Sequence, residues 1–221
     1  MNIFDKIPVK LDFETLIGKL KIQQDMPEYA EFRELFNQAE TVICPKAIIT
    51  NTPVVGVIDD HLLLPAGKLN SKILSKKCGQ LENIFIFAAT CGRELDGIKI
   101  ADTDFLGAFW LDTIKEEALI LAMSFLKKFI QKTYNVEKCV SMCPSDLNVW
   151  PLIELKTVYS LLAPDAQKIG IELTEHCYII PNKSLCGIFF AIDDSFSPCE
   201  VCDKQNQCDR QHDIGNNECM I

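Results

Sequence analysis

The sequence predicts an α+β fold, in which a mainly antiparallel sheet is flanked by helices and followed by a Cys-rich, metal-binding tail. Residues 84–89 (IFIFAA) are apolar without interruption, which indicates a strand in the middle of a sheet. Residues 171–180 and 185–192 alternate at period two around a four-residue loop, which predicts a β-hairpin. Helices and strands do not follow one another as regular βαβ units, so a doubly wound fold is not expected. We expect one domain over residues 1–195 and the tail over residues 196–221.

The N-terminal part is expected to contain two helices and two strands. Residues 12–20 place their apolar side chains on one helical face. Residues 25–28 resemble a capping box with a proline in the first turn, which predicts a second helix that ends near Glu40. The β-branched residues of segments 42–49 and 54–58 predict two strands.

The longest predicted helix covers residues 104–132. Its first turns are apolar all round, whereas polar side chains form a stripe further along, so we expect a buried N-terminal half and a half-exposed C-terminal half. Asp112 and Lys115 lie off that stripe, and their spacing predicts an i,i+3 ion pair. Pro151 is expected to open a further helix, with these residues facing inward: Leu152, Leu155, Val158, Tyr159 and Leu162.

Composition excludes several classes of function. The chain has 221 residues, 48% of them hydrophobic, so it can bury a substantial core. Its formal net charge of −9 argues against nucleic-acid binding, which needs basic patches. Charged residues are spread through the first 21 positions and no apolar run is long enough to span a bilayer, so we expect neither a signal peptide nor a membrane partner. We therefore expect a cytoplasmic protein whose thiols are reduced.

The C-terminal tail carries the most specific pattern, a C-x2-C-x5-C-x10-C spacing in a polar segment. The cysteines are Cys199, Cys202, Cys208 and Cys219. Two residues between the first two thiolates let both sulfurs reach one centre. Three interpretations stay open on the spacing alone: a metal or iron–sulfur centre, redox-active thiols, or a tail without a site.

Elsewhere the motifs are weaker. Phosphate-binding glycine loops, nucleophile elbows and H-E-x-x-H are absent from the sequence. Cys91 lies before a glycine and near Arg93, where a thiol pKa can be lowered, but a small buried residue at a tight turn is the favoured interpretation. Cys139 and Cys143 form a C-x3-C pair that the preceding helix could bury.

Residues 142–192 resemble the activation (reactivation) domain of vitamin B12-dependent methionine synthase, in the free-standing form linked to corrinoid methyltransferases. The resemblance is carried by MCPSDLNVWPL at 142–152, IGIELTE at 169–175 and IPNKSLCGI at 180–188. It implies a protein that docks on a cobalamin (corrinoid) methyltransferase and supports reduction of inactive cob(II)alamin to cob(I)alamin. The cobalamin is then expected on the partner, since the chain has no D-x-H-x-x-G motif of its own.

The family holds S-adenosylmethionine with an R-x-x-x-G-Y turn, and the chain departs from that pattern. The resemblance places Ser141 at the Arg position, with Pro144 preceding the Gly position, and Ser145 and Asp146 at the Gly and Tyr positions. Serine cannot supply the forked cation that arginine offers to a carboxylate. Binding of S-adenosylmethionine in its usual form is therefore expected to be weak.

The resemblance implies a redox function for the tail, because reduction of cob(II)alamin needs a low-potential electron. An iron–sulfur cluster, [4Fe–4S] by its four thiolates, can supply one. The resemblance thus favours Cys199, Cys202, Cys208 and Cys219 as cluster ligands, with Cys186 as a substitute for the fourth. Two alternatives remain: a zinc-stapled, non-catalytic docking subunit, and an S-adenosylmethionine-dependent methyl donor in methionine synthase reactivation.

Overall fold

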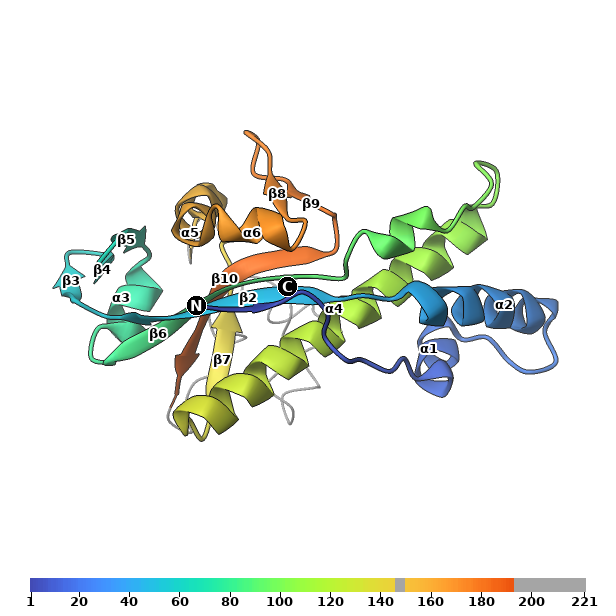
Figure 1. Ribbon diagram of the computed structural model, residues 1–221, viewed down its shortest axis with the longest axis horizontal. Helices are drawn as coiled ribbons and strands as arrows, with labels where there is room; N and C mark the ends of the chain where they lie inside the picture. The colour runs from blue at the N-terminus through green and yellow to red at the C-terminus, as the bar shows by residue number, and fades with distance from the viewer. Residues whose placement is uncertain (146–149, 193–221) are drawn as a thin grey trace.

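A five-stranded antiparallel sheet forms the centre of the protein, seen in a computed structural model that describes residues 1–145 and 150–192 (Figure 1). The strand order is β1-β2-β6-β10-β7, and every neighbouring pair is antiparallel. The strands are β1 (Asn2–Phe4), β2 (Lys46–Pro53), β6 (Asn83–Thr90), β7 (Cys139–Met142) and β10 (Ser184–Ala191). The predicted α+β class, with a mainly antiparallel sheet flanked by helices, is confirmed.

Strand β6 lies in the middle of the sheet, as its uninterrupted apolar sequence predicts. It pairs with β2 on one side and β10 on the other, and residues 84–90 are all buried. Because side chains alternate along a strand, Ile84, Ile86 and Ala88 enter one core. Phe85, Phe87 and Ala89 enter a second core on the opposite face.

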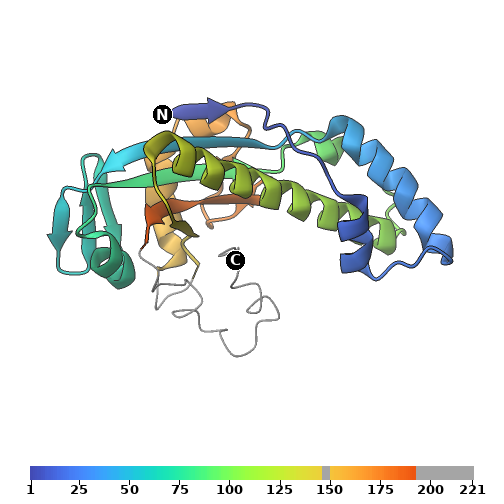
Figure 2. The same ribbon diagram turned by 90° about the horizontal axis from the view of Figure 1, so that it is seen from below.

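Helix α4 (Phe105–Tyr134) crosses that second face (Figure 2). Its N-cap is Asp104, which accepts a hydrogen bond from Gly107 N, and it ends at Asn135 in the left-handed conformation. The expected burial of its first turns is wrong in part. Phe105 is 82% exposed and Phe109 is 58% exposed. An apolar sequence on all sides of a helix does not reveal that the neighbouring elements cover only one face.

The N-terminal half of α4 packs against α1 (Phe13–Leu20) and α2 (Pro27–Val42) in a third core beyond the sheet. Asp12 caps α1 through Thr15 N, in agreement with the predicted helix at 12–20. The predicted capping box at 25–28 is wrong, because the N-cap of α2 is Met26 and it has no side-chain cap hydrogen bond. Helix α2 also extends to Val42, so the strand expected at 42–49 begins only at Lys46.

The other face of the sheet is covered by smaller elements. These are β3 (Gly56–Ile58), β4 (His61–Leu64), β5 (Gly67–Asn70), α3 (Lys72–Cys78), α5 (Leu155–Leu162) and α6 (Asp165–Lys168). Two 3₁₀ turns, Glu94–Gly97 and Leu152–Glu154, connect to α4 and α5 respectively. The predicted helix after Pro151 is therefore present, although Leu152 lies in the 3₁₀ turn and is exposed rather than inward-facing.

The hairpin expected between residues 171–180 and 185–192 does not form. Strand β8 (Glu172–Leu173) pairs with β9 (Ile179–Ile180), while β10 pairs with β6 and β7. A period-two pattern identifies strands but not their partners, and β6 precedes β10 by about 100 residues. Among the described residues, no helix is both long and apolar enough to cross a membrane.

Gly187 offers a test of this packing. A Cβ there would collide with the Met142 carbonyl oxygen and with the Cys143 side chain, so we expect Gly187→Ala to lower the free energy of unfolding by about 1–3 kcal/mol. Gly18→Ala is the matched control, since nothing lies within 4 Å of its added Cβ and alanine favours the helix by about 0.5–1 kcal/mol. Urea denaturation of both variants measures the difference. Equal stabilities would contradict the close approach of the 142–143 backbone to β10.

Candidate functional site

The start of β2, the end of β6 and the start of β10 lie side by side at one edge of the sheet, and their terminal residues are polar. Lys46 of β2 and Ser184 of β10 are both register partners of Thr90 on β6. The Thr90 hydroxyl oxygen accepts hydrogen bonds from the Ser184 hydroxyl at 2.8 Å and from Gly92 N at 3.1 Å. The end of the central strand is thus held by polar contacts that involve β10 and the following turn.

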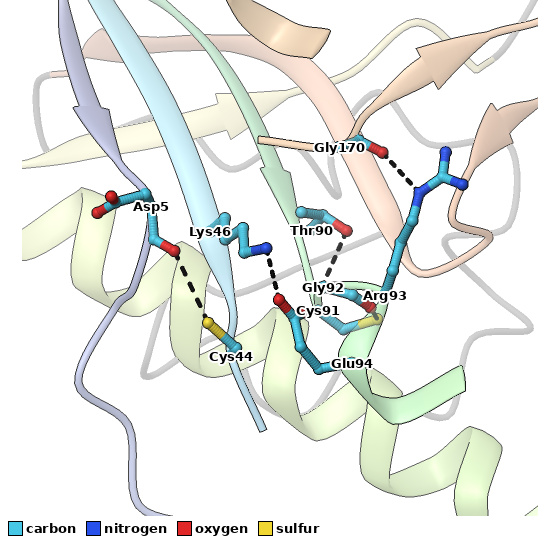
Figure 3. Close-up of polar contacts among 9 residues, drawn as sticks. All are labelled: Asp5, Cys44, Lys46, Thr90, Cys91, Gly92, Arg93, Glu94 and Gly170. Atoms are coloured by element: carbon cyan, nitrogen blue, oxygen red, sulfur yellow. Dashed lines mark hydrogen bonds and ion pairs between the residues drawn. The ribbon is translucent and has the colours of Figure 1, made fainter. Parts of the chain in front are cut away.

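The turn after β6 requires glycine. Gly92 has φ +88, a left-handed conformation that side chains rarely adopt. An added Cβ would also collide with the Cys44 carbonyl oxygen and with Glu94 Oε2. Gly92 therefore allows the chain to turn tightly and to place Arg93 and Glu94 on opposite sides of the strand end, as Figure 3 shows.

Glu94 is held by Lys46, with Nζ and Oε1 2.6 Å apart. Burial is the largest single influence and raises the pKa of Glu94, but the hydrogen bond and the charge of Lys46 and two backbone hydrogen bonds together outweigh it, so the pKa is lowered. The second carboxylate oxygen, Oε2, is buried and has no hydrogen-bond partner among the described residues. Glu94 therefore stays ionised near neutral pH and keeps one acceptor available.

Arg93 extends from the same turn to the β8 segment. Its Nε donates to the Gly170 carbonyl oxygen at 3.1 Å (Figure 3). A terminal nitrogen of Arg93 also lies 2.7 Å from Glu172 Oε1. The guanidinium thus connects the sheet to the β8–β9 hairpin and is already neutralised by a carboxylate.

Two more lysines lie near this turn, and together with Lys46 and Arg93 they form what we call the charged rim. Lys183 Nζ lies 2.8 Å from Asp112 and 3.8 Å from Glu116, both on α4, and Lys115 Nζ lies 2.6 Å from Asp96. The predicted Asp112–Lys115 pair is therefore wrong, because each residue has a partner from another element. The four cations of the rim (Lys46, Arg93, Lys115 and Lys183) all have carboxylate partners, so the rim offers no uncompensated charge to a small anion.

The thiols near this rim are poor nucleophiles. Burial raises the pKa of Cys91 to about 11, which confirms the interpretation of a small buried residue at a tight turn. Burial, followed by the charge of Glu94, also raises the pKa of Cys44, whose Sγ lies 3.7 Å from the Asp5 carbonyl oxygen (Figure 3). Both thiols are therefore protonated at neutral pH. In the C-x3-C pair Cys139 is buried, as expected, whereas Cys143 is half-buried.

A cavity of about 450 Å³ adjoins the rim. Its lining residues are Tyr159 of α5, Gln167 of α6, and Glu172 and Leu173 of β8. The Tyr159 hydroxyl donates to the Ile171 carbonyl oxygen at 3.0 Å, and burial raises its pKa. Since Glu172 also binds Arg93, the cavity and the charged rim share one wall.

The described residues of the predicted S-adenosylmethionine turn lie on or directly after β7, an edge strand of the sheet. Ser141 is half-buried on β7 opposite Phe189 of β10, Pro144 is buried, and Ser145 is exposed and donates its backbone N–H to the Trp150 carbonyl oxygen. None of these residues lines the cavity, and Asp146 lies outside the described residues. The indole nitrogen of Trp150 is buried and has no hydrogen-bond partner in the described part of the chain.

The predicted metal ligands Cys199, Cys202, Cys208 and Cys219 also lie outside the described residues, so their assignment stays a prediction. Within residues 1–145 and 150–192, no group of three or more His, Cys, Asp or Glu side chains could hold a metal ion. Cys186, the suggested substitute ligand, is buried in the core, and burial raises its pKa further than that of Cys91.

Comparison with known proteins gives a fold relationship. No family model matches the sequence, and no curated protein matches it. A crystal structure of the MetH reactivation domain bound to AdoHcy is similar in fold, with a TM-score of 0.57 and 15% sequence identity. The match covers 85% of this chain and 72% of that chain. At this identity the similarity establishes the fold alone.

The charged rim can be predicted from the sequence only in part. The sequence indicates a tight turn after the buried strand at residues 89–94, but the partners Lys46, Gly170 and Glu172 are distant in sequence. The pairing of β2 with β6 brings Lys46 to this turn, and the fold places the separate β8 segment beside it.

The Lys46–Glu94 pair predicts a specific pH dependence. Since the pKa of Glu94 is lowered in the folded state, its stabilising contribution is present above its ordinary pKa of 4.5 and is lost as the pH falls through the folded-state value. We expect the urea midpoint of the wild-type protein to fall more between pH 7 and pH 3 than that of Glu94→Gln. Glu40→Gln, which removes an exposed carboxylate of α2, is the control and should follow the wild type. An equal fall in Glu94→Gln and wild type would show that the pair contributes nothing.

Proposed function

We propose that this protein docks on a cobalamin-dependent methyltransferase and supports the reduction of its inactive cob(II) form to cob(I). One observation carries the proposal: a chain whose residues 142–192 resemble the methionine synthase reactivation family has the fold of a MetH reactivation domain over 85% of its length. The sequence pattern of residues 142–192 and the backbone arrangement of the described residues therefore point to the same family of corrinoid-linked domains. The cobalamin would be carried by the partner.

The geometry of the described residues supports a docking role more than a catalytic one. The cations at the strand ends are neutralised by carboxylates, and the adjacent thiols are protonated at neutral pH. A catalytic acid, base or nucleophile needs a pKa near its working pH, and raised thiol pKa values move away from it. A rim of fixed charge pairs instead suits a rigid surface that positions a partner.

The tail would provide the redox part of this role. We propose that Cys199, Cys202, Cys208 and Cys219 hold an iron–sulfur cluster, [4Fe–4S] by the number of thiolates. When bound, such a cluster supplies a low-potential electron, and cob(II) requires one electron to become cob(I). A zinc ion would suit the same four thiolates and would leave the protein as a non-catalytic docking subunit.

A methyl donor role for S-adenosylmethionine is the second candidate, because the similar solved domain is bound to AdoHcy. The substitutions at Ser141 and Ser145 remove the arginine and glycine of the family turn. Calorimetric titration separates this candidate from the first: heat of tight S-adenosylmethionine binding would favour methyl transfer and would mean that other residues build the pocket.

The docking role predicts a preference among cobalt states. A protein that promotes reactivation must bind the inactive cob(II) form better than the methylated form, or it would trap the productive enzyme. We expect pull-down with a corrinoid methyltransferase protein to recover more of this chain in the cob(II) state than in the methyl state, and little binding of free cobalamin. The apo partner is the control. Indifference to the cobalt state would leave only a scaffold role, and tight binding of free cobalamin would place the cofactor on this chain.

The ligand assignment is tested by metal content after anaerobic purification. We expect a brown protein with iron and sulfide, and we expect Cys199→Ser, Cys202→Ser and Cys208→Ser each to lose most of the metal. Cys44→Ser and Cys78→Ser, which change thiols of the folded domain, should retain it. A colourless, zinc-containing protein would favour the zinc-stapled alternative, and equal metal in all five variants would refute the ligand assignment.

A further inference from the structure

The first two turns of α4 expose large apolar side chains to solvent. Phe105 is 82% exposed, Leu106 is 45% exposed and Phe109 is 58% exposed. Trp110, Leu111 and Ile114 of the same helix are buried in the core that α4 shares with α1 and α2. Phe105 and Phe109 are therefore not part of this core, because other side chains of α4 form the face that packs against α1 and α2.

Helical geometry places the exposed phenylalanines on one line. Residues four apart lie one above the other on a helix, so Phe105 and Phe109 share the face opposite Trp110 and Ile114. The same face continues to Asp112 and Glu116, which Lys183 holds from the segment before β10. Figure 1 shows this end of α4 beyond the five-stranded sheet, where a partner can approach it. We call Phe105, Leu106 and Phe109 the α4 tip.

The charges around the α4 tip restrict which kind of partner can bind it. Asp102 and Asp104 precede it and are exposed, whereas Asp112, which follows one helical turn after Phe109, is already paired with Lys183. A second copy of this chain, with a net charge of −9, would bring these carboxylates against others of the same sign. An anionic membrane surface would be repelled for the same reason, since interfacial helices carry Lys and Arg beside their apolar face.

We infer that the α4 tip docks as a guest helix into an apolar, basic-rimmed groove on the corrinoid-bearing partner; this rests on the proposed function. Two aromatic anchors at i and i+4 on an exposed helix are the pattern of helix-in-groove recognition. Anchors of this kind dominate interface energetics when a pocket covers them. Lysine or arginine residues at the rim of the groove would meet Asp102 and Asp104.

The test compares two double variants of the full-length protein. Phe105→Ser/Phe109→Ser removes both anchors, and Val55→Ser/Ile58→Ser is the matched control, because Val55 and Ile58 are 65% and 61% exposed. The control site lies at the opposite end of the molecule, at β3 (Figure 1). Biolayer interferometry against an immobilised cob(II)-loaded corrinoid methyltransferase measures the dissociation constant at 50 and 200 mM salt.

We expect the α4 tip variant to bind at least about tenfold more weakly than the wild type, and the control within about twofold of it. Wild-type binding should weaken as the salt concentration rises, because the acidic flanks contribute. Circular dichroism melting checks that both variants fold; the single variant Phe105→Gln, at the most exposed position, replaces the double variant if that one does not.

The outcomes separate this inference from the proposed function. If the wild type binds and the α4 tip variant binds equally well, the docking surface is elsewhere and only this inference fails. If the wild type forms a dimer in sedimentation that the α4 tip variant abolishes, a second copy is the occupant and the inference is overturned. If the wild type binds no corrinoid protein in any cobalt state, the proposed function and the inference fail together.

Discussion

Burial of strand β6 on both faces is the constraint on which the rest of the structure depends. Its backbone groups are satisfied by β2 and β10, and its alternating side chains enter two separate cores. Each core must then be closed by other elements, because apolar side chains on a two-sided strand cannot face water. Helix α4 closes one face, and α3, α5 and α6 contribute to closing the other.

The same constraint creates the charged rim. Where β6 leaves the core after Thr90, the chain has to turn sharply, and Gly92 makes this turn possible. The next residues then reach laterally, Arg93 to the β8 segment and Glu94 to Lys46. The rim is therefore a consequence of ending a buried strand, and its ion pairs connect elements that are distant in sequence. Such partly exposed pairs contribute little to stability but fix the relative positions of the surfaces they join.

The sequence allowed the fold class, the central position of residues 84–89 and the long helix to be predicted, because each depends on local periodicity. It did not allow strand pairing to be predicted: β10 joins β6 rather than residues 171–180, and the alternation of apolar residues is the same in both arrangements. The partners of Asp112 and Lys115 were missed for the same reason, since neither pair is local. The exposure of Phe105 and Phe109 could not be seen either, because it reflects which face of α4 lacks a neighbour.

The two described arginines clarify what the substituted turn at the sheet edge can do. Arg33 lies 3.4 Å from the centre of the Phe13 ring and bonds the Tyr29 hydroxyl, and Arg93 is bound to Gly170 and Glu172. Neither is available to replace the cation that Ser141 lacks. The backbone at the start of this turn has a fixed position, because Gly187 lets residues 142–143 lie directly against β10. The described part of this turn therefore presents backbone and hydroxyl groups but no cation, which is compatible with the proposed docking role and does not favour S-adenosylmethionine binding in the manner of the family that residues 142–192 resemble.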